Sequence, residues 1–158
     1  MQIDILKYLD KKDIVFKIKG KSKKSILTFF VDHLIATKKI DKKYRKEIIK
    51  ALLQREEMGS TAIGGGVALP HVRLEIVKRV ILCVGISSKG VNFDSLDGEP
   101  VYIIVLLLSP QKEAGLHLKI LALLARILKD KYFIQRLKEA SEPEEVISLL
   151  QRQQSLVG

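Results

Sequence analysis

Two segments in the first third of the chain carry apolar residues at helical spacing. Within residues 25–39, the residues at helical spacing are Ile26, Phe29, Phe30, Leu34 and Ile35. Within residues 41–58, the apolar stripe consists of Ile48, Ile49, Leu52 and Leu53. Such spacing places the apolar side chains on one side of a helix. Ser22 or Ser25 supplies an N-terminal cap for the first helix, and Gly59 is a typical stop signal after the second.

Two later runs are continuously apolar and favour buried strands. Val80–Ile86 and Val101–Ser109 are rich in β-branched and aliphatic residues, a composition typical of strands that are buried on both faces. The connection between them, residues 88–100, holds Gly, Asn, Asp and Pro and is predicted to be a turn-rich loop.

Helical spacing returns after the second strand. Residues 112–130 carry an apolar side formed by Leu116, Ile120, Leu123, Leu124 and Ile127. Residues 131–140 and 143–153 predict two shorter helices, and Pro143 suits the first turn of the last one. The order of elements indicates an α/β protein, with a mixed β-sheet flanked by helices on both faces. We expect one domain over residues 1–158.

Composition agrees with a folded protein that does not cross a membrane. The chain has 158 residues, of which 47% are apolar and 29% charged, and this length suits a single domain. The longest apolar run, Val101–Leu108, is much shorter than the roughly 20 residues of a membrane-spanning helix. Cys83 is the one cysteine, so no disulfide forms within the chain. We therefore expect a cytoplasmic protein.

Positive charge is concentrated near the N-terminus. The net charge is +10, and the first 50 residues hold 15 Lys and Arg against 6 Asp and Glu. Such an excess attracts nucleic acid, an anionic membrane or an acidic partner. The lysines alternate with the apolar residues of the predicted helices, which is more typical of a solvated surface.

The most unusual stretch is Ser60–Val72, which reads STAIGGGVALPHV. It lacks the Lys-Ser/Thr pair of a phosphate-binding P-loop, and Leu69 stands where a dinucleotide fingerprint needs its third glycine. No paired cysteines or HExxH motif suggest a metal site. What remains is His71, held after a stiff proline and a glycine-rich turn.

A histidine in this setting is suited to phosphoryl transfer. Neutral imidazole offers a nucleophilic nitrogen, because the ordinary histidine pKa is about 6.5. Transfer then needs positive charge and hydrogen-bond donors around the phosphoryl oxygens. The residues with suitable chemistry are Arg55, His117, Ser60, Thr61 and Gly64. We assign no role to His33, which falls within the first predicted helix.

The combination resembles a known signature. The stretch REEMGSTAIGGGVALPH is similar to the active-site signature of phosphotransferase-system (PTS) enzyme IIA domains of the fructose/mannitol and nitrogen-regulatory type. The signature positions are filled here by Glu56, Ile63, Gly64, Val67, Ala68, Leu69, Pro70 and His71. The segments SKKSIL, FDSLDGEPVYIIVLLLSP and HLKILALLARIL extend the resemblance over roughly residues 5–150.

The resemblance implies an activity, a site and partners. His71 is then the phosphoacceptor, His117 lies in the same site, and Arg55 neutralises phosphoryl charge. The implied donor is the carrier protein HPr or its nitrogen-type paralogue, and the implied acceptor is a regulatory target or an enzyme IIB domain. No cofactor or metal is implied, and nucleic acid is not expected as a partner. The implied fold is again a mixed sheet flanked by helices.

Two features bear on the access of the donor protein and on the choice between the family's two types. Family members usually carry a small residue after the histidine, whereas this chain has Val72, which we expect to crowd the donor. The absence of a fused transport domain favours a stand-alone nitrogen-regulatory enzyme IIA. The alternatives are a sugar-specific transport component for fructose or mannitol, or a regulatory binding module with a basic face that is not phosphorylated.

Overall fold

One long hairpin forms the centre of the protein. The computed structural model describes residues 2–157. Strand β4, Ile81–Val91, pairs in antiparallel fashion with β5, Val101–Pro110, and the register runs from Ile81 opposite Leu108 to Val91 opposite Val101. The pairing is irregular between Ile86 and Val91. Strand β4 thus continues beyond the end expected at Ile86, and the loop that was expected from residue 88 begins only after Val91.

Three short strands extend the hairpin into a mixed sheet. Strand β1, Ile14–Val15, runs parallel to β4, while β2, Val67–Ala68, and β3, His71–Leu74, run parallel to β5. The strand order is β1-β4-β5-β2, with β3 also paired to β5. The apolar pattern predicted none of these three, because two to four residues are too few for a periodic pattern.

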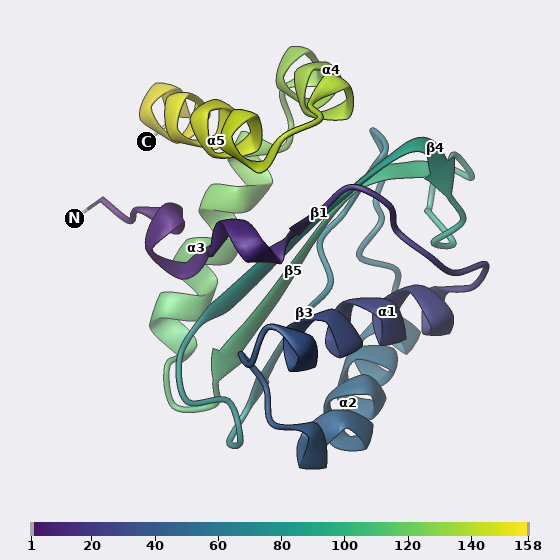
Figure 1. Ribbon diagram of the computed structural model, residues 1–158, viewed down its shortest axis with the longest axis vertical. Coiled ribbons are helices and arrows are strands. Elements are labelled where there is room, and N and C mark those ends of the chain that lie inside the picture. Colours follow the sequence, from purple (N-terminus) through teal and green to yellow (C-terminus); the bar gives the residue numbers. More distant parts are fainter. Residues whose placement is uncertain (1, 158) are drawn as a thin grey trace.

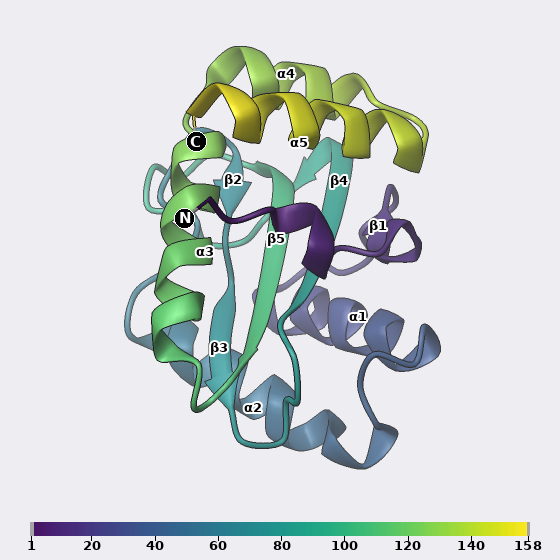
Figure 2. The same cartoon turned by 90° about the vertical axis from the view of Figure 1, so that its left-hand side faces the viewer.

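Helices cover both faces of the sheet, as Figures 1 and 2 show. Helices α1, Lys23–Ala36, and α2, Arg45–Glu57, lie on one side. Helices α3, Ala114–Ile127, α4, Lys131–Glu139, and α5, Pro143–Val157, lie on the other. Short 3-10 helices occupy Ile5–Tyr8, Lys11–Asp13 and Lys42–Tyr44. The expected α/β class, with a mixed sheet between two helical layers, is confirmed.

Alternating side chains of the central strands fill two cores. Leu82 and Val84 pack with α3, α4 and α5, whereas the intervening Cys83 packs with α1 and α2. Strand β5 alternates in the same way, with Val105 on the first side and Leu106 on the second. Successive side chains of a strand point to opposite faces, so a continuously apolar strand serves two helical layers at once. Burial raises the pKa of the Cys83 thiol, which suits a core residue rather than a nucleophile.

The helix boundaries agree closely with the expected ones. Ser22 caps α1 by accepting a hydrogen bond from the backbone nitrogen of Ser25, whose side chain in turn accepts from the backbone of Ser22. The two serines that the sequence offered as alternative caps therefore act together as a capping box. The helix expected from Asp41 begins as a 3-10 turn and becomes α-helical at Arg45. Within residues 2–157, no helix is both long enough and apolar enough to cross a bilayer.

Candidate functional site

The glycine-rich turn delivers His71 to the edge of β5. Gly64, Gly65 and Gly66 all have positive φ angles, of 139°, 71° and 77°, a region that side chains disfavour. The carbonyl of Gly66 then accepts from the backbone nitrogens of Tyr102 and Ile103, which returns the chain to the sheet. The glycines therefore make a turn that places β2, and then β3, alongside β5.

The hydrogen bonds of His71 define its tautomer. Its Nδ1 lies 2.8 Å from the carbonyl oxygen of Leu69. A carbonyl oxygen only accepts, so Nδ1 carries the hydrogen. The other nitrogen, Nε2, accepts from Nε of Arg55 at 3.3 Å. The neutral ring thus presents the lone pair of Nε2 to the site.

The surroundings keep His71 neutral. Burial lowers the pKa of His71, and the positive charge of Arg55 lowers it further. The hydrogen bond to Leu69 and the charge of Glu56 oppose these effects without cancelling them. Because the pKa lies below its ordinary value, the nucleophilic form of the ring dominates at neutral pH.

Arg55 is held in place at the end of α2. Its Nη1 donates to the carbonyl oxygen of Gly59 at 3.0 Å, while its Nε faces His71. The guanidinium group therefore spans from the turn after the helix to the first residue of β3. A fixed, always-charged fork of donors is well suited to phosphoryl oxygens.

His117 brings a second imidazole from the opposite helical layer. It lies in the first turn of α3 and is only 5% exposed. Its ring centroid is 5.6 Å from that of His71, and its Nδ1 is 2.8 Å from Oγ of Ser109. Burial, and then the nearby His71 and Arg73, lower the pKa of His117 to about 4. Residues from α2, β3 and α3 thus meet at one place, as the sequence predicted for Arg55, His71 and His117.

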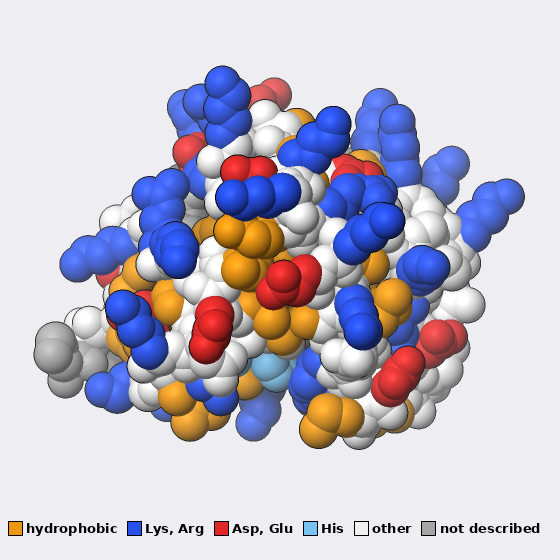
Figure 3. All heavy atoms as spheres, turned by 90° about the horizontal axis from the view of Figure 1, so that it is seen from below, with side chains coloured by type: hydrophobic (Ala, Val, Ile, Leu, Met, Phe, Trp, Pro, Cys, Tyr) orange, Lys and Arg blue, Asp and Glu red, His pale blue; other side chains and the backbone are white. Residues whose placement is uncertain are grey.

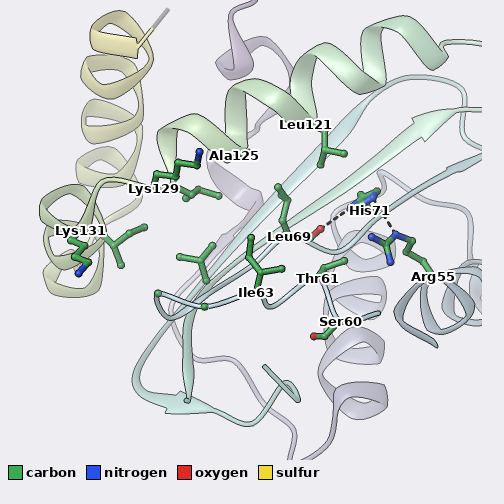
Figure 4. A pocket seen from close by; sticks show the side chains of 15 residues that line it. Arg55, Ser60, Thr61, Ile63, Leu69, His71, Leu121, Ala125, Lys129 and Lys131 are labelled. Carbon is green, nitrogen blue, oxygen red and sulfur yellow. Dashed lines mark hydrogen bonds between the residues drawn. The ribbon is translucent and has the colours of Figure 1, made fainter. Parts of the chain in front are cut away.

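A groove extends from His71 along α3 and α4. It has a volume of about 480 Å³, and Figure 4 shows Arg55 and His71 at one end with Lys129 and Lys131 toward the other. Its apolar lining consists of Ile63, Val67, Leu69, Leu121, Ala125, Leu128 and Ile134. Ile63 is 74% exposed. This combination of an apolar floor and basic residues beside His71 suits contact with another macromolecule.

No group of three or more His, Cys, Asp or Glu side chains within residues 2–157 is arranged to hold a metal ion. The site consists instead of two neutral imidazoles and one guanidinium group.

Comparison with known proteins places the site in a family. Residues 7–153 match the family described as "Phosphoenolpyruvate-dependent sugar phosphotransferase system, EIIA 2". The chain belongs to this family. A nitrogen regulatory protein of Bradyrhizobium diazoefficiens is 35% identical over 105 residues, which cover 66% of this chain and 69% of that protein. The matches to the nitrogen regulatory proteins of B. diazoefficiens and Klebsiella oxytoca cover 69% and 64% of those proteins' lengths.

Other enzyme IIA proteins extend the comparison. The fructose-specific EIIABC component of Bacillus subtilis is 30% identical over 146 residues, which cover 92% of this chain and 23% of that protein. The crystal structure of the nitrogen regulatory protein IIA-Ntr from Neisseria meningitidis superposes with a TM-score of 0.83 and 32% identity, covering 92% of this chain and 98% of that one. The resemblance inferred from the signature is therefore confirmed at the level of the enzyme IIA family and its fold.

In this enzyme IIA chain, the side chains of Ser60 and Thr61, which were also expected to contact the phosphoryl group, form hydrogen bonds within and around the turn. Thr61 donates from its hydroxyl to Oε2 of Glu56 at 2.6 Å and from its backbone nitrogen to Oε1 at 3.0 Å. The Ser60 hydroxyl donates to the carbonyl oxygen of Phe93 and accepts from the backbone nitrogen of Ala62. Gly64 lines the groove together with these two residues. Their contacts hold the shape of the turn around His71, whereas the sequence suggested phosphoryl contact.

The role of Glu56 was not recognised from the sequence. Its carboxylate is 6% exposed and lies 3.3 Å from Nζ of Lys23, in addition to accepting both donors of Thr61. The carbonyl of Thr61 accepts from the backbone nitrogen of Leu69, whose own carbonyl holds Nδ1 of His71. A chain of one ion pair and several hydrogen bonds thus runs from α1 to the ring of His71. The signature included Glu56, but only the fold shows what it contacts.

Val72 does not crowd the site as expected. It packs against the core between the sheet and helices α1 and α2, as does Leu74. Because side chains alternate along a strand, Val72 points away from the face on which His71 lies. The crowding expectation rested on the β-branched side chain alone, and the structure does not support it: Val72 is the second residue of β3, so its side chain lies on the other face of the strand from His71.

Proposed function

We propose that the protein is a phosphohistidine carrier of the phosphoenolpyruvate-dependent phosphotransferase system and that Nε2 of His71 accepts the phosphoryl group. The observation that carries this proposal is the pair of contacts on the His71 ring, at 2.8 Å to Leu69 and 3.3 Å to Arg55. They leave the lone pair on Nε2, next to a cation. Membership of the enzyme IIA family supports the same chemistry.

The transfer step requires no proton movement at His71. The lone pair of Nε2 forms a bond to phosphorus, and the bond between phosphorus and the donor atom breaks, with its electron pair returning to the donor. Nδ1 keeps its hydrogen and its bond to Leu69 throughout. The Leu69 carbonyl stabilises the positive charge that develops on the ring, in the way that a hydrogen-bonded partner orients and supports a reacting histidine.

Arg55 and His117 are placed to share the negative charge of the phosphoryl group. In the free protein Arg55 donates to Nε2 itself, so this hydrogen bond must shift to a phosphoryl oxygen as the new bond forms. His117 approaches from the other side of the site. Donors that are already in position cost no reorganisation during transfer, and such electrostatic stabilisation is usually a large part of catalysis.

A partner protein must bring the phosphoryl group to His71. We propose that the donor is HPr or its nitrogen-type paralogue and that it contacts the surface around the groove. The apolar lining gives contact area, and Lys129 and Lys131 favour acidic side chains on the donor at that end. The acceptor is a regulatory target or an enzyme IIB domain.

Of the two family types, we propose the nitrogen-regulatory one. The similarity to the nitrogen regulatory proteins of B. diazoefficiens and N. meningitidis supports this choice. The alternative, a sugar-transport component for fructose or mannitol, is supported by the match to the fructose-specific component of B. subtilis. Phosphoryl transfer to a purified IIB domain would favour the transport role, whereas binding to a regulator that depends on the state of His71 favours the regulatory role.

Several of the basic residues near the N-terminus form ion pairs with acidic residues of the same chain. Lys23 pairs with Glu56, Lys39 with Asp13 at 2.8 Å, and Arg45 with Asp32 at 2.6 Å. On the face in Figure 3, Lys and Arg side chains are spread widely and acidic side chains lie among them. A nucleic-acid-binding module would require a gel shift that weakens steeply with salt. If such a shift were seen and no phosphate were taken up, the binding-module alternative would replace our proposal.

The proposal is tested by following the mass of the protein. Incubation with phosphoenolpyruvate, the first enzyme of the system and HPr should add one acid-labile phosphoryl group. The same reaction with the nitrogen-type enzyme and carrier identifies the preferred donor. His71→Ala should abolish the gain, and His33→Ala, which alters a histidine outside the site, should retain it. Uptake that persists in His71→Ala would refute the assignment of His71.

A further inference from the structure

Ser109 is a buried polar residue next to the site. It lies in β5 opposite Arg73 of β3 and is 0% exposed. Its hydroxyl oxygen is 2.8 Å from Nδ1 of His117, which is its one side-chain partner among residues 2–157. No sequence pattern singles out this serine, which stands near the end of an apolar strand. Its position behind His117 suggests that it acts on that ring.

Two arrangements satisfy the distance between Ser109 and His117. In the first, Nδ1 of His117 carries the hydrogen and donates to the serine oxygen. In the second, the serine hydroxyl donates to a bare Nδ1, and the ring hydrogen resides on Nε2. A neutral imidazole has one N–H, so the two arrangements are different tautomers.

The burial of Ser109 favours the second arrangement. If Nδ1 donated, the serine hydroxyl hydrogen would face the protein interior without an acceptor. Burying an unsatisfied donor is costly, whereas the second arrangement satisfies both groups. The ring is also neutral at physiological pH, because the pKa of His117 is lowered to about 4. A protonated ring, which would donate from both nitrogens, is therefore not the resting state.

We propose that Ser109 is a positioning residue that fixes the hydrogen of His117 on Nε2, so that His117 serves as a hydrogen-bond donor to the phosphoryl group on His71. The role of His117 toward a phosphoryl group rests on the proposed function. The tautomer of His117 does not, because it is a property of the free protein. The two imidazoles then differ in role. The carbonyl of Leu69 leaves Nε2 of His71 bare, and Ser109 leaves Nε2 of His117 protonated.

The ring centroids of His71 and His117 are 5.6 Å apart. The different tautomers explain how two neutral histidines can both take part in one phosphoryl transfer. A bare nitrogen on His117 would repel the phosphoryl oxygens, whereas an N–H donor attracts them. No proton leaves His117 in this step; its N–H only donates a hydrogen bond. A partner that selects the tautomer of a reacting histidine has a large effect on rate in the Ser-His-Asp proteases, where loss of the correct tautomer is strongly inhibitory.

The tautomer is measured directly on the unmodified protein. Long-range ¹H–¹⁵N correlation spectra of the ¹⁵N-labelled chain at neutral pH distinguish protonated from bare ring nitrogens. The chain has three histidines, and spectra of His33→Gln and His71→Gln identify their signals by difference. We expect a bare Nδ1 and a protonated Nε2 for His117. A protonated Nδ1 would overturn the proposal without any effect on the assignment of His71.

Variants at Ser109 test the consequence for transfer. Ser109→Ala should give a mixture of His117 tautomers and slow phosphoryl uptake by about twofold or more, because only rings with a protonated Nε2 present a donor, whereas Ser109→Thr, which keeps the hydroxyl, should restore both. The matched control is Ser87→Ala, which removes a buried serine that accepts from Gly90 in β4. Wild-type tautomer and rate in Ser109→Ala would refute the proposal. If that variant does not fold, the wild-type spectrum still decides. If the wild-type chain takes up no phosphate, the proposed function fails, but the tautomer assignment stands or falls separately.

Discussion

Nε of Arg55 lies 3.3 Å from Nε2 of His71, although the two residues are 16 positions apart and belong to different elements. The guanidinium group occupies the place where a phosphoryl group would approach the ring. It therefore lowers the basicity of the nitrogen in the free protein, and in the proposed transfer it would neutralise phosphoryl charge. The same contact connects the proposed chemistry with a measurable pH dependence.

Replacing the Arg55 guanidinium should slow phosphoryl uptake without unfolding the protein. We expect Arg55→Gln to reduce the single-turnover rate of transfer from HPr by about 100-fold, because one oriented donor to a developing charge is typically worth that much. The matched control is Arg45→Gln, which removes an exposed arginine paired with Asp32. Equal rates for Arg55→Gln and wild type, in quenched-flow measurements, would remove Arg55 from the mechanism.

The pH dependence of uptake should follow the protonation of His71. Burial and Arg55 lower the pKa of His71, so its Nε2 keeps the lone pair at pH values below the ordinary histidine pKa of about 6.5. We expect the uptake rate to stay level as the pH falls from 8 through about 6.5 and to decline only at lower pH. In Arg55→Gln the decline should begin at higher pH, because one cause of the lowered pKa is gone. An unchanged profile in that variant would contradict the electrostatic role.

Stability should also fall with acidity, and His117 contributes to this effect. Its pKa is about 4 in the folded protein, whereas the unfolded chain has the ordinary value of about 6.5. Between these values the unfolded state binds more protons, so the free energy of unfolding is highest above about pH 6.5 and decreases as the pH approaches 4. We expect His117 to account for about 2 to 3 kcal/mol of this loss.

Urea unfolding at pH 7.5 and 4.5 measures the loss. His117→Gln should lose less stability between the two pH values than the wild-type chain, since the residue that must take up a proton is absent. His33→Gln is the control outside the site. If His117→Gln and the wild-type chain lost the same amount, the buried neutral state of His117 would not be the cause.

How far the sequence predicted this structure depends on the length of each pattern. The helices and the two long strands were predicted because each carries several periodic or continuous apolar residues. The short strand β3, which begins at His71, was not, because its four residues have no pattern of their own. It exists because the glycine turn brings it against β5. The direction of the Val72 side chain likewise follows from its place in this strand.

The site was only partly predictable for a related reason. His71, Arg55 and His117 were identified because a family signature and their chemistry pointed to them. Ser109 and Lys23 carry no local signal, since a serine in a strand and a lysine at a helix start are common. Their contacts with His117 and Glu56 arise from packing between segments distant in sequence. Only the fold shows that these polar groups are buried together.

The hydroxyl of Thr61 should contribute measurably to stability. It donates to the buried carboxylate of Glu56 at 2.6 Å, and hydrogen bonds to charged groups are worth about 1.5 to 3 kcal/mol. We expect Thr61→Val to lower the free energy of unfolding by about 2 kcal/mol. It should also slow phosphoryl uptake, because the turn that holds Leu69 would loosen. Thr28→Val, on α1, is the control. Wild-type stability in Thr61→Val would show that the Glu56 network does not hold the turn.

Two glycine substitutions should have opposite effects on stability. Gly65 has a φ angle of 71° and its added Cβ would meet nothing within 4 Å, so Gly65→Ala introduces backbone strain without a clash. We expect a loss of about 1 kcal/mol, the typical cost of a left-handed conformation for a residue with a side chain.

Gly115, in the first turn of α3, also has open space around it. Gly115→Ala should raise stability by about 0.5 kcal/mol, because alanine favours the helix. Urea denaturation measures both values. A Gly65→Ala variant as stable as the wild type would mean that the turn presenting His71 does not require the conformation that glycine alone adopts freely.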